Sequence, residues 1–302
     1  MSVSVVQQRL KPWVLPIAMV AGALFHETIT VLSPLVPYLI FTMLFITFCR
    51  ISPSQIRFTA AMLRLLCVQM VGSILFFVIL KPFSLPLAQA VFICVFCPTA
   101  TAAPVVTGML GGNVAKVAAY SIFVNIAVAL AAPFLFIWIG AGENELSFCE
   151  EFLSICKRVA PLIVLPLLCV FLLYRIAPRI HEAVKNVQSI SFYLWAVSLI
   201  IVVGKSVSFI LAEPSSAIML MVAMALFALI VCVVQFYVGR KIGASDGDKV
   251  SSAQSLGQKN TVLAIWMSLT YFNPISSIGP AAYIIWQNGI NSAQLYFKMK
   301  KK

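Results

Sequence analysis

The chain has 302 residues, of which 62% are hydrophobic and only 10% are charged, and its mean hydropathy is +1.02. Soluble domains carry roughly 25% charged residues, so these charges are too few to cover a water-soluble surface. The net charge of +12 does not indicate a nucleic-acid-binding protein, because the basic residues stand singly between long apolar runs and form no basic face. The composition predicts a protein whose main solvent is the lipid bilayer.

Ten apolar segments approach the length of a membrane-spanning helix, which needs about 20 mostly apolar residues. A closed β-barrel is excluded because its strands alternate apolar and polar residues, whereas these runs are continuously apolar. Basic residues before the first segment resemble a signal peptide, but no small-residue cleavage site is evident, so we expect an uncleaved first helix. The predicted segments are 13–27, 33–49, 61–80, 86–110, 115–139, 159–176, 189–211, 215–238, 250–272 and 275–296.

The lysines and arginines predict the orientation of the chain, because cytoplasmic loops of membrane proteins are enriched in both. With the N-terminus in the cytoplasm, sixteen of the 21 basic residues fall in inside segments and three fall in outside segments. We therefore expect a multi-pass protein with both termini in the cytoplasm. As a separate prediction, we expect the membrane to be the inner (plasma) membrane of a bacterium.

The long outside loop 140–158 divides the chain into two halves of five predicted helices each, 1–139 and 159–302. An odd number of helices in each half inverts the second half relative to the first, which is a common plan in transporters. The predicted fold class is an all-α membrane protein with ten transmembrane helices in two inverted five-helix repeats. Cys149 and Cys156 share the loop, and the sequence leaves open whether they pair.

Two of the predicted helices carry a matching defect. The fourth segment contains Pro98 and Pro104, and each proline removes a helix hydrogen bond and clashes with a preceding carbonyl. The ninth segment contains the polar run 255–261, with a single strongly apolar side chain. Each defect lies in the fourth helix of its half, and paired interruptions at corresponding positions indicate a transporter site.

Lys259 lies in the second interruption, roughly 15 Å from either end of its predicted helix. A lysine at the centre of a membrane costs roughly 2.5–3.5 kcal/mol on insertion scales, so such a residue usually faces a polar cavity. The alternative is a lysine that only backbone carbonyls satisfy. Lys205 lies nearer a helix end, and we expect its ammonium to reach the interface.

These interruptions resemble motifs of the bile acid:sodium symporter family. The first part of the resemblance is Cys97-Pro98 through Thr101-Ala102, then Val105-Val106-Thr107 and Gly112-Asn113, which is similar to the family's CPGGTASNVVT…GN. The second part is Gly257, Asn260, Thr261, Leu263 and Ala264, which is similar to E-x-G-x-Q-N-[ST]-x-L-A. Trp286-Gln287-Asn288 is similar to the family's late W-H-N.

The resemblance implies a core of helices 3–5 and 8–10, a panel of helices 1, 2, 6 and 7, and a substrate cavity between them. Helices 4 and 9 would be broken and would cross at the middle of the membrane. The resemblance, together with the hydroxyl and amide side chains in the interruptions, suggests substrate contacts at Thr99, Thr101, Asn260, Thr261 and Gln287. Gln287 replaces a family histidine.

The chain departs from the family where sodium would bind. The crossover Glu and Gln and the Ser-Asn pair of the fourth helix correspond here to Ser255, Lys259, Ala103 and Pro104, and two hydroxyl positions of the fifth helix correspond to Val117 and Ser121. Gln69, in the third predicted helix, matches a glutamine of the family's sodium site. Hard cations require oxygen ligands, preferably with a carboxylate, and all nine acidic residues fall in predicted loops or at helix ends. We therefore expect no metal site and no sodium coupling.

An enzyme is not indicated, because His26-Glu27 lacks the second histidine of a zinc protease motif and no Walker motif is present. We expect a carrier of a small organic anion without a cofactor, with Lys259 as the coupling residue. A fixed charge on Lys259 would suit uniport or exchange, whereas a proton taken up and released there would suit proton coupling. The alternative is a channel or a membrane receptor or sensor on the same fold.

Overall fold

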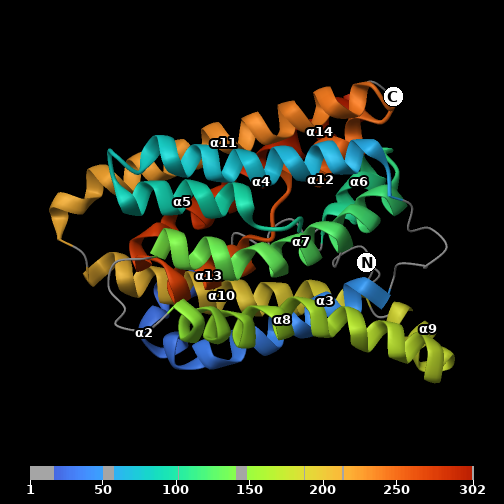
Figure 1. Cartoon of the computed structure of the whole chain (residues 1–302), viewed down its shortest axis with the longest axis horizontal. Coiled ribbons are helices and arrows are strands. Elements are labelled where there is room, and N and C mark those ends of the chain that lie inside the picture. Colours follow the sequence, from blue (N-terminus) through green and yellow to red (C-terminus); the bar gives the residue numbers. More distant parts are fainter. Residues whose placement is uncertain are drawn as a thin grey trace, which may run out of the picture.

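The computed structural model describes residues 17–49, 58–100, 102–140, 148–186, 188–212 and 214–300. Across these ranges the chain is almost entirely helical, and the only extended pairing is one isolated antiparallel bridge between Thr99 and Lys259. The prediction of an all-α protein is confirmed (Figure 1).

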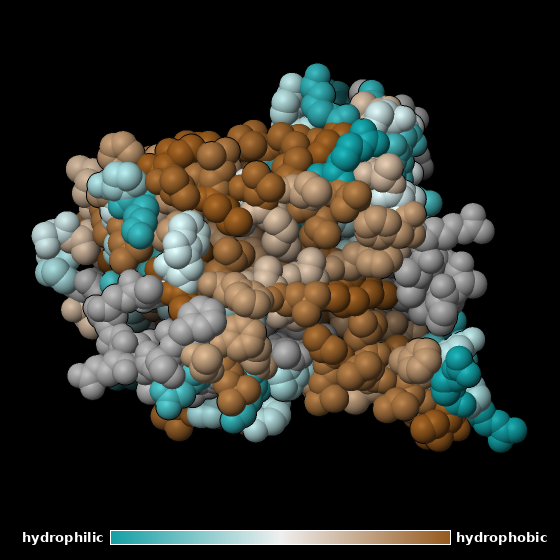
Figure 2. All heavy atoms as spheres, in the orientation of Figure 1, coloured by the Kyte–Doolittle hydropathy of each residue, from teal (hydrophilic) through white to brown (hydrophobic). Residues whose placement is uncertain are grey.

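Four helical stretches are long and apolar enough to cross a membrane, judged by length and composition: His26–Cys49, Ala60–Leu80, Val114–Gly140 and Ser215–Ala244. Shorter apolar helices accompany them, including Leu85–Phe96 and Thr261–Tyr271. On the face shown in Figure 2, hydrophobic residues cover most of the middle, and hydrophilic residues gather mainly near the ends. Exposed leucine, valine and phenylalanine side chains of this kind require lipid as solvent, so the chain is an integral membrane protein.

The first part of the chain forms a helical hairpin followed by four helices. Its elements are residues 17–24, α2 (His26–Ile29), η1 (Thr30–Leu35), α3 (Val36–Cys49), α4 (Ala60–Leu80), α5 (Leu85–Phe96), α6 (Ala103–Met109) and α7 (Val114–Gly140). Successive contacts with the later helix α10 (Gln188–Ala212) show where the hairpin turns. His26 hydrogen-bonds Ser208, whereas Ser33 and Val36 line a pocket with Lys205 and Ile201. The chain therefore reverses at η1, so the stretch His26–Cys49 is not one straight helix.

The second part of the chain begins with a helix that starts earlier than predicted. Its elements are α8 (Phe148–Ile176), α9 (Pro178–Asn186), α10, η3 (Ser215–Ala217), α11 (Ile218–Ala244), α12 (Lys249–Gly257), α13 (Thr261–Tyr271), η4 (Pro274–Ser277) and α14 (Ile278–Lys300). Since α8 starts at Phe148 rather than at 159, Cys149 and Cys156 are both helical. Seven residues of helix separate their Cα atoms by about 10 Å, beyond the roughly 7 Å that a disulfide spans, and both thiols are free.

The helices form two layers, seen one above the other in Figure 1. The panel layer comprises residues 17–24 with α2, α3, α8, α9 and α10, and the core layer comprises α4 to α7 and α11 to α14. The layers meet where α7 packs against α8 and where α13 packs against α10 and α3. Both short pairs of helices, α5 with α6 and α12 with α13, belong to the core layer.

Glycines allow α12 to pack directly on the backbone of α11. A Cβ atom added at Gly239 of α11 would lie 2.6 Å from the carbonyl oxygen of Ser252, which is too close for any side chain. At Gly257, the last residue of α12, an added Cβ would lie 2.5 Å from the Phe236 ring. Small residues are the usual means of close helix packing in membranes, and here they hold the end of α12 in place beside α11.

Candidate functional site

The first interruption begins where α5 ends at Phe96. Cys97 has an extended conformation, with φ −56° and ψ 143°. A residue before proline is sterically driven out of the helical region, so Pro98 accounts for the end of α5. The helix resumes at Ala103, with Pro104 in its first turn, where a proline has no hydrogen bond to lose. The prolines therefore break this helix as the sequence predicts.

The second interruption begins where α12 ends at Gly257. Gln258 is extended, with φ −95° and ψ 107°. The helix resumes at Thr261, and the side-chain oxygen of Asn260 accepts a hydrogen bond from the Leu263 amide at 3.2 Å. A side chain that caps the first turn in this way favours a helix start, so Asn260 fixes where α13 begins.

The two interruptions pair with each other. The Ala100 amide donates to the Gln258 carbonyl at 2.9 Å, and the Asn260 amide donates to the Pro98 carbonyl at 2.9 Å. The Thr99 hydroxyl, which lies between these bonds, donates to the Ser255 carbonyl at 2.7 Å. The extended segments thus provide hydrogen-bond partners for several of each other's backbone groups. Non-helical backbone away from water requires such partners.

Side chains from three other segments cap the open end of α5. Gln235 of α11 donates to the Cys94 carbonyl at 3.3 Å, and the Lys259 ammonium donates to the Val95 carbonyl at 2.8 Å. Gln69 of α4 donates to the carbonyls of Phe96 and Cys97 at 2.9 and 3.1 Å. Four successive carbonyls at the negative end of a helix dipole are therefore satisfied, one of them by a lysine.

Lys259 is only 1% exposed and is held at both of its ends. Its amide donates to the side-chain oxygen of Gln287 at 2.8 Å, while its ammonium reaches Val95. In the part of the chain that the structure describes, no carboxylate lies within 4.0 Å of this ammonium. The side chain thus points at the end of α5 and not into an open cavity. This geometry corresponds to the alternative in which only backbone carbonyls satisfy the lysine.

The structure brings together most of the proposed substrate-contact residues. Thr99, Asn260 and Thr261 lie in the paired segments or next to them, and Gln287 of α14 joins them through Lys259. Thr101 lies outside the described residues. Each of the four described side chains is at most 4% exposed, so a substrate could reach them only if surrounding helices separate.

The residues at the family's sodium positions have other partners here. Gln69, besides capping α5, accepts a hydrogen bond from the Tyr120 hydroxyl at 3.1 Å. Ser255 uses its carbonyl for Thr99, and Ser121 accepts from Asn125 on its own helix, α7. Ala103, Pro104 and Val117 are buried and contribute no side-chain oxygen. Among the described residues no cluster of three or more His, Cys, Asp or Glu side chains could hold a metal ion.

Three further residues of the site were not singled out from the sequence, and these are Gln235, Tyr283 and Gln258. Gln235 donates not only to Cys94 but also to the Tyr283 hydroxyl at 3.0 Å, and that hydroxyl donates to the Gly257 carbonyl at 2.7 Å. Gln258 is buried, and its side-chain oxygen has no hydrogen-bond partner in the described part of the chain. A lone glutamine within the apolar run 215–238 was the available signal for Gln235.

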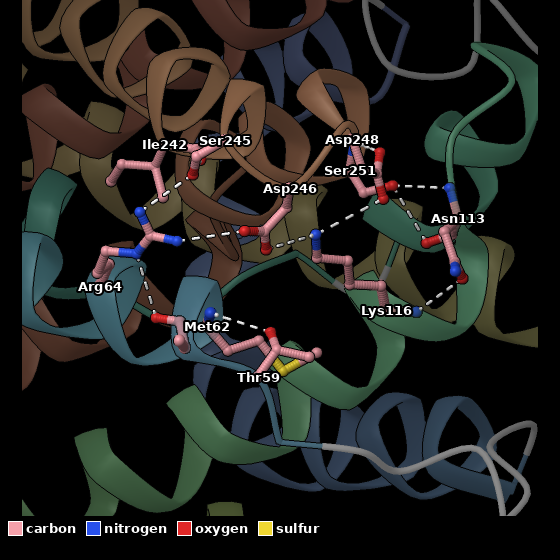
Figure 3. Close-up of polar contacts among 11 residues, drawn as sticks. Thr59, Met62, Arg64, Asn113, Lys116, Ile242, Ser245, Asp246, Asp248 and Ser251 are labelled. Atoms are coloured by element: carbon pink, nitrogen blue, oxygen red, sulfur yellow. Dashed lines mark hydrogen bonds and ion pairs between the residues drawn. The ribbon is translucent and has the colours of Figure 1, made fainter.

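An ion-pair network ties the start of α12 to α4 and α7 (Figure 3). Asp246, in the turn before α12, lies 3.2 Å from Arg64 of α4 and 3.5 Å from Lys116 of α7. Asp248 lies 3.8 Å from Lys116 and caps α12 by accepting from the Ser251 amide at 3.0 Å. These contacts hold the start of α12 in the core layer. At the other end, Gly257 lies against the Phe236 ring, and its carbonyl accepts a hydrogen bond from Tyr283.

A scan against models of protein families finds no match, and a search of curated proteins finds no match. The resemblance to bile acid:sodium symporters therefore stays a prediction that depends on the motifs quoted above.

Proposed function

We propose that this chain is a carrier of small organic anions that works without sodium, with a fold like that of the bile acid:sodium symporters. In this proposal the helices up to α7 and the helices from α8 onward form two inverted five-helix repeats. Both termini lie in the cytoplasm, and the membrane is the bacterial inner membrane. The two-layer arrangement of the helices, with both interrupted helices in one layer, supports this proposal.

The observation that carries the proposal is the pairing of two interrupted apolar helices at Thr99 and Lys259. Interrupting two membrane helices at one place sacrifices regular hydrogen bonds, and such breaks in transporters form the binding site for substrate and coupling ion. The polar side chains at the crossing are buried, so binding there requires the helices to move. A protein that exposes one site alternately to the two sides needs a movement of this kind.

Lys259 gives the proposed carrier its independence from sodium. The resemblance implies that a cation binds beside this position, and here the ammonium lies at the negative end of α5 instead. A tethered cation cannot be transported, so it provides positive charge near the crossing without an ion gradient. If the charge is permanent, the protein works as a uniporter or exchanger. If Lys259 releases a proton in each cycle, transport is proton-coupled.

The test is transport by the full chain in proteoliposomes, with labelled small carboxylates such as benzoate and lactate as probes. Lys259→Gln should abolish uptake, whereas Lys259→Arg should keep exchange and lose any uptake driven by a pH gradient, since arginine does not readily release a proton. Lys249→Gln removes an exposed lysine from the start of α12 and should transport like the wild type. Wild-type transport by Lys259→Gln would refute the mechanism.

A further inference from the structure

A pocket lies at the seam between the panel and core layers, and no residue of the buried crossing lines it. Ser33 and Val36 line it from the hairpin, Ile201 and Lys205 from α10, and Trp266 and Leu269 from α13. Its volume of about 30 Å³ has room for one or two water molecules. The pocket therefore joins residues of both layers, and it would widen if the layers moved apart.

Lys205 is the charged group of this pocket. The structure places the side chain of Lys205, partly buried, among the pocket residues, seven positions before the end of α10. That its ammonium reaches the interface stays a prediction. Seven residues of helix correspond to about 10 Å. No ion pair of Lys205 occurs among the described residues, so its charge has no carboxylate partner there.

Both polar and apolar residues lie around Lys205. Ser33 lines the pocket, and one turn along α10 Ser208 contacts His26 at 3.1 Å and Thr30 at 3.2 Å. The apolar lining includes Trp266, Leu269, Ile201 and Val36. A cation beside an aromatic and aliphatic wall matches a ligand that joins one negative charge to an apolar body.

We propose that Lys205 binds the carboxylate of the substrate at this seam, while the apolar part of the substrate lies against Trp266 and Leu269. This inference rests on the proposed carrier function and deepens it. It assigns direct contact with the anion to Lys205 and leaves to Lys259 the coupling role proposed above. The substrate class is then a small amphipathic monocarboxylate, which enters when the panel and core layers separate at the seam.

The test measures local charge and needs no transport. The exposed and partly buried cysteines Cys67, Cys149, Cys156 and Cys169 are replaced, the four buried ones are kept, and Ser33→Cys provides the reporter in the full chain. Anionic sulfonatoethyl and cationic trimethylammonioethyl methanethiosulfonates of similar size are compared in neutral phosphatidylcholine vesicles. The ratio of anionic to cationic labelling rates should fall about tenfold in Lys205→Gln and stay high in Lys205→Arg.

Lys157→Gln, which removes an exposed lysine from α8, is the matched control and should leave the ratio unchanged. Potassium benzoate should slow labelling in the parent but not in Lys205→Gln. An unchanged ratio in Lys205→Gln would overturn the inference. It would also be overturned if phosphatidylglycerol in the vesicles slowed labelling of the reporter cysteine and benzoate did not. If neither Ser33→Cys nor a second reporter, Leu269→Cys, reacts, the pocket does not open to water and the inference is wrong. If benzoate slows labelling of the reporter cysteine but proteoliposomes show no transport, the carrier function is refuted and the carboxylate site at Lys205 still stands.

Discussion

The ammonium nitrogen of Lys259 lies 2.8 Å from the carbonyl oxygen of Val95, so a side chain of the second interruption caps the helix that leads into the first. The two residues are 164 positions apart in the chain. The bond makes the two interrupted helices one structural unit, together with the bridge at Thr99. It also means that any movement of α12 and α13 away from α5 must give this carbonyl a new partner.

Replacing Lys259 by methionine should destabilise the fold by about 1–3 kcal/mol, because the buried Val95 carbonyl loses its donor. Lys241→Met, at an exposed position near the end of α11, serves as the control and should change stability by less than about 0.5 kcal/mol. Thermal unfolding of the purified protein in detergent measures the difference. Equal unfolding temperatures for the two variants would show that the Val95 bond contributes nothing.

Replacing Thr99 by valine should lower stability by about 1 kcal/mol, because the hydroxyl that joins the two interruptions through the Ser255 carbonyl is lost. Thr107→Val is the matched control, since the Thr107 hydroxyl is also buried but bonds to Ala103 within its own helix α6. If the bond helps to hold the crossing, Thr99→Val should also reduce transport more than Thr107→Val does. Equal transport by both variants would contradict a role for this bond at the crossing.

Sodium should not stabilise the protein. A ligand that binds only the folded state raises stability by RT ln(1 + [L]/Kd), and the positions where the family binds sodium hold Lys259, Ala103, Pro104 and Val117 here. Replacing potassium by sodium at constant ionic strength should leave the melting temperature unchanged. A saturable rise specific to sodium at millimolar concentration would show that the chain holds the ion with other ligands.

The proposed orientation can be tested at the two ends of one helix. Ser216 and Ser245 are exposed and flank α11, whose 27 residues span about 40 Å. In the background lacking the four accessible cysteines, Ser216→Cys should react with an impermeant thiol reagent added to intact cells, and Ser245→Cys should react only after permeabilisation. The reverse pattern would refute the cytoplasmic placement of the termini.

Asp246→Asn should lower stability by about 0.5–1 kcal/mol at low salt, because Asp246 pairs with both Arg64 and Lys116. Glu182→Gln interrupts the single ion pair that Glu182 makes among the described residues, with Lys185 on α9, and should have a smaller effect. The difference should shrink at high salt, where exposed charges are screened. Thermal unfolding at two salt concentrations measures it, and an effect of Glu182→Gln as large as that of Asp246→Asn would argue against the network.

Local sequence patterns predicted the helical segments and the positions of both breaks. Pro98 and the polar run 255–261 act on their own backbone, so their effect is visible without knowledge of the fold. Helix starts were less predictable, since α8 begins at Phe148 in a stretch whose acidic residues look like a loop. Near this start the Phe152 ring packs against the Phe134 ring of α7, a tertiary contact that the local pattern does not reveal.

The sequence by itself determined that this chain is a helical membrane protein with two interrupted helices and a lysine in the second interruption. Apolar composition and proline are local properties that hold in any arrangement of the helices. Only the tertiary structure decided the partners of the freed groups: Lys259 on Val95, Gln69 on Phe96 and Cys97, and Lys205 at the seam beside Trp266. Such contacts join residues far apart in the chain, and their choice depends on which helix faces pack together, which residue spacing does not encode.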